Sequence, residues 1–175
     1  MWGGRLRVNN IYLCGTMGSG KSTIGKLVAE GLDVRFVDLD AEIEAESQKT
    51  VKRIFAEEGE EAFRQWETRA LRRVAASKGA IVSLGGGTLL REENRCLLKK
   101  EMVIALVCSA DVAYNRCLSD QKRPLLLDFE DFQKRCAERE AMQRKVSDLQ
   151  IRTDKDPAHK VAKKLITKIK EENCV

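Results

Sequence analysis

Residues 15–23 read GTMGSGKST, and residues 15–22 fit the phosphate-loop pattern GxxxxGK[ST]. The apolar run 10–14 precedes the motif, and apolar residues at helical spacing follow it in residues 21–32. A strand, a glycine-rich turn and a helix in this order direct backbone N–H groups at one anion. In this pattern the lysine approaches the β- and γ-phosphates of a nucleotide, and the serine hydroxyl faces Mg²⁺. The cofactor-binding candidates are Gly18, Ser19, Gly20, Lys21, Ser22 and Thr23.

Strands and helices alternate along the rest of the chain. Strand-like apolar runs occupy residues 34–38, 80–84, 102–108 and 149–153. Helical spacing occurs in residues 41–58 in two pieces, and in 60–77, 92–100, 111–118, 129–147 and 157–172. This alternation predicts an α/β fold with a five-stranded parallel sheet and helices on both faces. Ligands of such sheets bind beyond the carboxyl ends of the strands.

Length and composition narrow the class of protein. The 175 residues predict a single domain over 1–175, and 43% hydrophobic with 34% charged residues excludes a disordered chain. No apolar stretch is long enough to span a membrane, and no secretory signal opens the chain. A net charge of +5 with few aromatic residues suits a protein that handles anionic metabolites, and we expect no nucleic acid partner.

The cysteine and histidine counts bear on compartment and chemistry. Six cysteines without any CxxC, in a chain without a signal peptide, predict reduced thiols in the cytoplasm. His159 is the single histidine, so a structural zinc site or a Ser–His or Cys–His catalytic pair is not expected. His159 itself is predicted to be a solvated residue of the last helix.

Two aspartates close the second predicted strand. Asp38 and Asp40 stand two residues apart, and the period of a strand would point both carboxylates to one side. One arrangement has Asp38 facing Mg²⁺ and Asp40 facing a hydroxyl of a second substrate. The alternative is structural, with Asp40 capping the helix that begins at Ala41.

Further candidates lie in a glycine run and among the arginines. Gly85, Gly86 and Gly87 follow an apolar strand and allow close approach to a ligand, although a plain flexible loop is the alternative. Arg64 and Glu67 stand three apart on one helix and are able to pair, as surface ion pairs also do. Residues 119–128 lack periodicity and contain Arg123-Pro124, which predicts a mobile lid flanked by Arg116 and Arg139.

Taken together, these motifs resemble the shikimate kinase family of small P-loop kinases. The resemblance extends from the first strand to the last helix and rests on motifs in a fixed order. These are GTMGSGKST at 15–23, DLD at 38–40, FRQWE at 63–67, SLGGGT at 83–88, RPLL at 123–126 and TDKDP at 153–157. The resemblance implies a monomeric cytoplasmic enzyme that uses ATP and Mg²⁺ to phosphorylate the 3-hydroxyl of shikimate.

The resemblance also implies roles for individual residues. Lys21, Asp40 and Arg123 would be catalytic, with Asp40 holding the accepting hydroxyl and Arg123 reaching the phosphates from the lid. Ser22 and Asp38 would form the metal side. The remaining nucleotide-binding residues would be Arg116, which stacks on adenine, and Arg152 and Pro157 of the adenine loop. The substrate would be bound by Asp40, Arg64, Glu67, Gly85, Gly86, Gly87 and Arg139.

The chain departs from the family pattern near the second arginine of the carboxylate clamp. Gln143 stands where an aromatic residue is usual, and the segment between Arg123 and Arg139 is short, so Arg135 and Arg144 are alternatives to Arg139. Two other functions also remain open. One is a kinase of the same scaffold that acts on gluconate or a nucleoside monophosphate. The other is a basic, nucleotide-switched binding protein, suggested by the Lys-rich residues 154–170.

Overall fold

A computed structural model describes residues 9–119 and 128–172 of the chain. Its strands form one sheet in the order β2-β3-β1-β4-β5, and every neighbouring pair is parallel. The strands are β1 (Ile11–Cys14), β2 (Arg35–Asp38), β3 (Ala80–Ser83), β4 (Met102–Val107) and β5 (Leu149–Arg152). The helices are α1 (Lys21–Leu32), α2 (Leu39–Ser47), α3 (Val51–Ala75), α4 (Glu92–Leu98), α5 (Ala110–Leu118), α6 (Phe129–Val146) and α7 (Ala158–Glu172), with a 3-10 turn η1 (Thr88–Leu90). The predicted five-stranded parallel α/β fold is confirmed.

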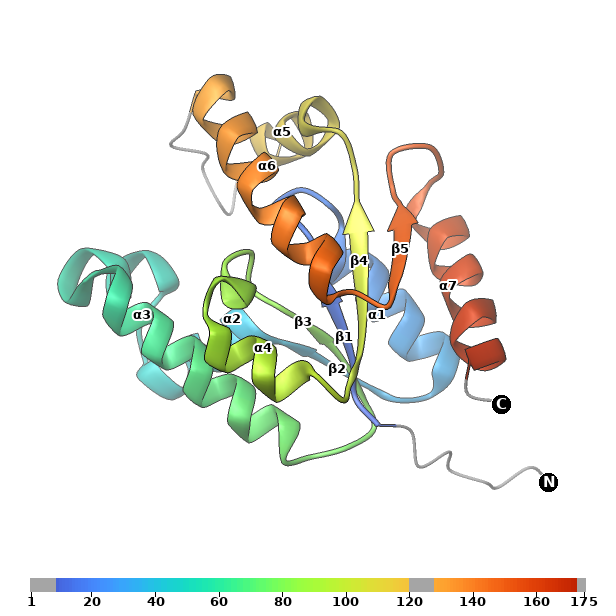
Figure 1. Cartoon of the computed structure of the whole chain (residues 1–175), viewed down its shortest axis with the longest axis horizontal. Coiled ribbons are helices and arrows are strands. Elements are labelled where there is room, and N and C mark those ends of the chain that lie inside the picture. The colour runs from blue at the N-terminus through green and yellow to red at the C-terminus, as the bar shows by residue number, and fades with distance from the viewer. Residues whose placement is uncertain (1–8, 120–127, 173–175) are drawn as a thin grey trace.

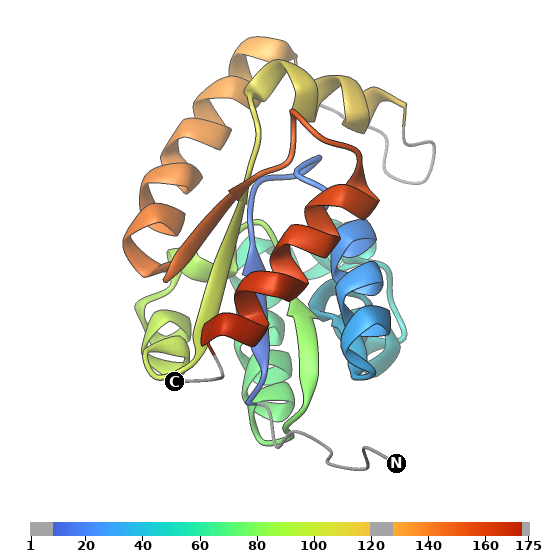
Figure 2. The same ribbon diagram turned by 90° about the vertical axis from the view of Figure 1, so that its right-hand side faces the viewer.

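Helices cover both faces of the sheet (Figures 1 and 2). Alternate residues of β1 serve two separate cores, because successive strand side chains point to opposite faces. Tyr12 and Cys14 pack with α2, α3 and α4, whereas Ile11 and Leu13 pack with α1 and α7. The sheet is therefore the middle layer of three.

The central strand sets the place of the ligand site. β1 lies between β3 and β4, so the chain moves to one side of β1 through β2 and β3 and to the other through β4 and β5. The strand order reverses at this point, and open α/β sheets bind their ligands beyond the carboxyl ends of the strands at such a reversal. The phosphate-loop motif follows β1 directly and therefore stands at this position.

Helix α3 is broken near its start. Gly59 has φ 84° and ψ 175°, so a short helical piece ends before it and a longer one begins at Glu60. The predicted boundary between residues 58 and 60 and the two helical pieces within 41–58 are both confirmed. A left-handed backbone at this position favours glycine.

Candidate active site

The phosphate loop joins β1 to α1. Gly18 and Gly20 have φ values of 79° and 93°, which an L-residue rarely adopts, and a Cβ on Gly18 would lie 2.2 Å from the carbonyl oxygen of Ala113. Lys21 folds its side chain over the loop and donates hydrogen bonds from Nζ to the carbonyl oxygens of Gly15 (2.8 Å) and Thr16 (2.9 Å). Residues 18–20 thus precede α1 and residues 21–23 form its first turn, which is the strand, turn and helix order that the motif predicts.

Residues distant in sequence hold the loop in place. The Arg116 side chain donates to the carbonyl oxygens of Gly18 (3.2 Å) and Thr153 (2.7 Å), and the Thr153 hydroxyl donates to the carbonyl oxygen of Ser19 at 2.9 Å. Arg116 therefore reaches the phosphate loop, and Thr153 is a structural residue for which the sequence analysis assigned no role. Buried hydrogen bonds of this kind fix backbone positions.

The adenine-loop candidates lie at the carboxyl end of β5. Arg152 and Pro157 are exposed. Arg152 Nη2 pairs with Asp154 Oδ2 at 2.5 Å, and the backbone N–H of Ser109 also donates to this carboxylate. The Arg152 hydrogen bond, followed by the Ser109 N–H, lowers the pKa of Asp154 from 3.8 to about 2. Asp154 therefore links the residue Ser109, which follows β4, to Arg152 at the end of β5.

The positions of Asp38 and Asp40 differ from those that the sequence predicts. Strand β2 ends at Asp38, and Asp40 stands in the first turn of α2, so the strand period does not relate their side chains. Asp38 rather than Asp40 caps α2, because its Oδ1 accepts a hydrogen bond from the Asp40 backbone N–H at 3.2 Å. Its Oδ2 accepts from the Ser22 hydroxyl at 2.7 Å, which brings the two predicted metal-side residues together.

The Gly85–Gly87 segment is the point at which the substrate candidates converge. A Cβ on Gly85 would lie 2.6 Å from Glu67 Oε1 and 2.9 Å from Asp40 Oδ1. A Cβ on Gly87 would lie 2.5 Å from Arg64 Nη1, and one on Gly86 would lie 3.0 Å from Arg139 Nη1. Gly85 and Gly87 leave room for candidate side chains from α2 and α3 that a Cβ would displace, and Gly86 lies against the end of Arg139 on α6.

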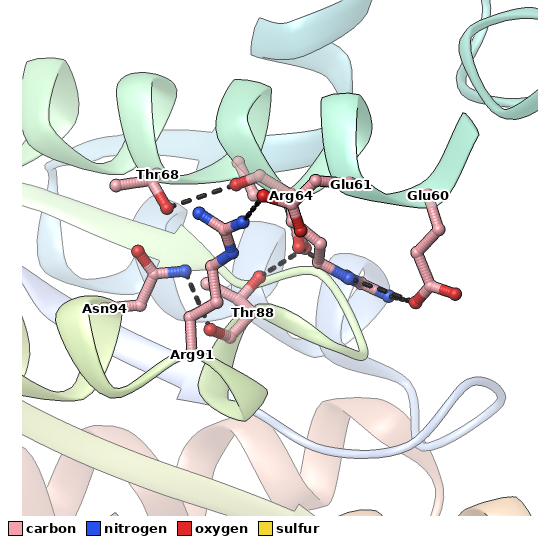
Figure 3. A network of polar contacts seen from close by, with 8 residues as sticks. Glu60, Glu61, Arg64, Thr68, Thr88, Arg91 and Asn94 are labelled. Carbon is pink, nitrogen blue, oxygen red and sulfur yellow. Dashed lines mark hydrogen bonds and ion pairs between the residues drawn. The ribbon is translucent and has the colours of Figure 1, made fainter. Parts of the chain in front are cut away.

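Arg64 and Glu67 form a buried ion pair rather than the solvated one considered as the alternative. Glu67 has no exposed surface, and Oε2 accepts from Arg64 Nη1 while Oε1 accepts from the Thr88 hydroxyl at 2.8 Å. Asn94, which is also buried, donates to the Thr88 carbonyl oxygen at 2.8 Å (Figure 3). No local pattern indicates the role of Thr88, because its partner Glu67 is 21 positions away in the chain. Asn94 then supports Thr88 from the helix that follows it.

Arg139 is the clamp candidate that reaches this site. Burial lowers its pKa, and the positive charges of Arg135 and Arg64 lower it further. Among the described residues Arg139 has no ion pair, whereas the alternative Arg144 pairs with Glu140 at 2.6 Å on the exposed side of α6. Arg135, the other alternative, is exposed. Arg64 and Arg139 both approach the Gly85–Gly87 segment, and two guanidinium groups at one place suit an anionic ligand.

Gln143 lies on the sheet side of α6. It is 5% exposed and lines a cavity of about 210 Å³ between α6, the end of β4 and Thr16 of the phosphate loop. The cysteines Cys108 and Cys136 line the same cavity. Gln143, which stands where an aromatic residue was expected, therefore lies at the contact between α6 and the sheet.

Three remaining predictions concern residues 120–127, His159 and membrane spans. Arg123 and the lid positions 120–127 lie outside the described residues. His159 is exposed, as predicted. Within residues 9–119 and 128–172, none of the helices has the length and apolar character needed to cross a bilayer.

The chain is similar to known proteins in both sequence and structure. The family model described as shikimate kinase matches residues 17–170. A shikimate kinase of Sulfurihydrogenibium sp. is 38% identical, with 93% of this chain and 99% of the relative covered. One of Persephonella marina is 49% identical over 68% of this chain and 73% of its own. The solved shikimate kinase from Acinetobacter baumannii in complex with shikimate is 34% identical, with a TM-score of 0.85 and 94% of both chains covered.

Proposed function

Because the chain belongs to the shikimate kinase family, as the match over residues 17–170 shows, we propose that it phosphorylates the 3-hydroxyl of shikimate with ATP. One observation supports the proposal above the others. Two arginines and an aspartate meet at the Gly85–Gly87 segment, at the same edge of the sheet as the phosphate loop. A carboxylate, a hydroxyl and a triphosphate are the three groups that such a site suits.

The nucleotide side is built from the phosphate loop. Backbone N–H groups of residues 18–23 and the N-terminus of α1 bind the phosphates, and Lys21 moves from the loop carbonyl oxygens to the β- and γ-phosphates. Arg116 packs along the adenine, and Arg152 and Pro157 border the adenine from the β5–α7 loop. Arg123, outside the described residues, is proposed to reach the phosphates from residues 119–128.

Ser22 and Asp38 fit Mg²⁺. Their oxygens lie 2.7 Å apart, and a hydroxyl with a carboxylate is an oxygen donor set that this cation prefers. Magnesium keeps several waters and takes its other ligands from the substrate phosphates, so two protein oxygens suffice. When bound, Mg²⁺ neutralises charge on the β- and γ-phosphate oxygens.

The shikimate side uses the clamp and the glycine segment. Arg64 and Arg139 bind the carboxylate, and Glu67 fixes the orientation of Arg64. The glycine backbone of Gly85, Gly86 and Gly87 lies close to the substrate ring because it carries no side chains. Asp40 then holds the 3-hydroxyl toward the nucleotide.

The chemical step is an in-line transfer. Asp40 orients the 3-hydroxyl and accepts its proton, and the hydroxyl oxygen forms a bond to the γ-phosphorus. The bond from that phosphorus to the β–γ bridging oxygen breaks, and ADP leaves with the electron pair. Lys21 and Arg123 stabilise the negative charge on the transferred group, which is the main catalytic contribution of the protein in such reactions.

An assay of ADP release distinguishes this function from the alternatives. We expect rapid turnover with shikimate and ATP, and little with quinate, gluconate or nucleoside monophosphates. Turnover with gluconate but not shikimate would assign the chain to another small-metabolite kinase. Nucleotide-dependent binding of a macromolecule without transfer to any small acceptor would support the binding-protein alternative. We further propose a monomer without nucleic acid or membrane partners that acts in the cytoplasm.

A further inference from the structure

One edge of the Arg64 guanidinium is already held by a second carboxylate. Glu60 lies one helical turn before Arg64 on α3, and its Oε1 accepts hydrogen bonds from Arg64 Nε (3.3 Å) and Nη2 (3.0 Å) (Figure 3). The Nε–Nη2 edge is a fork that binds carboxylates in fixed geometry. Glu60 therefore occupies the kind of contact that a substrate carboxylate makes with an arginine.

The two carboxylates on Arg64 differ in how firmly they are held. Glu67 is fully buried and receives the Thr88 hydroxyl as a second partner. The Glu60 side chain is 66% exposed, and within residues 9–119 and 128–172 Arg64 is its single ion-pair partner. The Arg64 end of this pair is buried, but the Glu60 carboxylate is solvated and exchanges its contact for water when an incoming anion replaces it, so its replacement costs little.

Glu67 and Gly87 make other contacts with the Arg64 guanidinium. Nη1 is taken by Glu67, and a Cβ placed on Gly87 would lie 2.5 Å from Nη1 and 2.6 Å from Nη2. The Nε–Nη2 edge is the one that contacts the exposed Glu60 carboxylate. Glu60 directly follows Gly59, where α3 is broken, so it stands in the first turn of the longer helical piece.

We propose that Glu60 is a positioning residue that occupies the carboxylate site of Arg64 until the substrate carboxylate displaces it. This inference rests on the proposed role of Arg64 in binding the substrate. The contact keeps the guanidinium oriented in the empty enzyme, and a carboxylate ligand must displace Glu60 before it binds this edge of the guanidinium. Affinity for shikimate is therefore lower than the two arginines alone would give.

The test compares Glu60→Gln with Glu61→Gln. Glu61 is the adjacent residue, is 72% exposed and pairs with Arg91, so its variant removes the same charge from the same turn without touching Arg64. We expect Glu60→Gln to lower the KM for shikimate about two- to fivefold, the effect of losing one competing ion pair whose carboxylate is solvated, with kcat and the KM for ATP unchanged. Glu61→Gln should leave all three constants unchanged.

Two further measurements make the result decisive. The neutral methyl ester of shikimate should bind wild type and Glu60→Gln equally, because it does not compete for the fork. An unchanged or raised KM for shikimate in Glu60→Gln, or the same fall in Glu61→Gln, contradicts the displacement. Arg64→Gln tests the premise separately: a large rise in the KM for shikimate supports Arg64 as the carboxylate site. No rise would refute that part of the proposed function and the displacement with it.

Discussion

The hydroxyl of Thr153 donates a hydrogen bond to the carbonyl oxygen of Ser19, and the two residues are 134 positions apart in the chain. Thr153 follows β5 and is buried, whereas Ser19 lies at the centre of the phosphate loop. This contact makes the shape of the phosphate loop depend on the last strand of the sheet, and its removal can be tested directly.

Thr153→Val keeps the side-chain shape and removes the hydroxyl. We expect a loss of about 1–2 kcal/mol in the free energy of unfolding, because a buried carbonyl oxygen loses its partner, and a severalfold higher KM for ATP. Urea denaturation and steady-state kinetics measure the two effects. Thr167→Val is the matched control, since the Thr167 hydroxyl bonds its own helix on an exposed face. Equal behaviour of the two variants would contradict the coupling.

Lys21→Met should give a folded protein with almost no turnover. The substitution removes the positive charge that approaches the transferred phosphoryl group while keeping most of the side-chain volume. Circular dichroism checks the fold and the ADP-release assay checks the activity. Lys26→Met, at an exposed position of the same helix, should retain activity. Near-normal turnover of Lys21→Met would refute the assignment of the phosphate loop.

Asp40→Asn should lower kcat by roughly 100-fold or more, because an amide cannot accept the proton of the 3-hydroxyl. ATP binding, measured by calorimetry, should be retained, since the metal side is assigned to Asp38 and Ser22. If the variant lost nucleotide affinity and kept its affinity for shikimate, the roles of Asp38 and Asp40 would have to be exchanged.

Gly87→Ala should raise the KM for shikimate at least about tenfold and leave the KM for ATP unchanged. Gly87 has φ −111° and ψ 0°, which alanine adopts, so the effect comes from the new methyl group against Arg64 Nη1. Gly79→Ala is the contrasting control. Gly79 has a φ of 77°, which alanine rarely adopts, and open space around its Cβ position. The melting temperature of this variant should therefore fall, while the KM values for shikimate and ATP should not change. A silent Gly87→Ala would separate Arg64 from substrate binding.

Asp154→Asn tests the pH dependence of stability. The Asp154 pKa is lowered from 3.8 to about 2 in the folded protein, so its contribution is complete above the unfolded value and is lost as pH falls from about 5 toward 2. Wild type should therefore be more stable than Asp154→Asn at pH 7, with the difference shrinking in acid. Urea unfolding at pH 7, 4 and 2.5 measures it, and a constant difference would contradict the assignment. Asp156→Asn, which breaks an exposed pair with Lys164, serves as the comparison.

Local patterns predicted the features that depend on neighbouring residues. The phosphate loop needs glycines at fixed spacing between a strand and a helix, and the break at Gly59 needs one glycine between two helical stretches. Both signals lie within a few residues of the structure they produce, so the sequence alone locates them.

Contacts between distant segments were beyond the same reasoning. The sequence does not show that Asp38 caps the helix and leaves Asp40 on its first turn, because strand and helix ends differ by a residue or two from any periodic pattern. Nor does any local pattern place the Thr88 hydroxyl on Glu67 or the Thr153 hydroxyl on Ser19. These hydrogen bonds form only after the strands have assembled, and their partners have no fixed spacing.

The glycine segment also limits how this enzyme is able to evolve. Side chains at Gly85 and Gly87 would displace Glu67, Asp40 or Arg64, so from the roles proposed for these residues we expect mutations there to remove activity before they alter substrate preference. Gly86 faces the flexible end of Arg139, which is able to shift by a few tenths of an ångström. New substrate preferences would therefore arise from helices α3 and α6, where charged side chains can be exchanged one at a time without distorting the backbone.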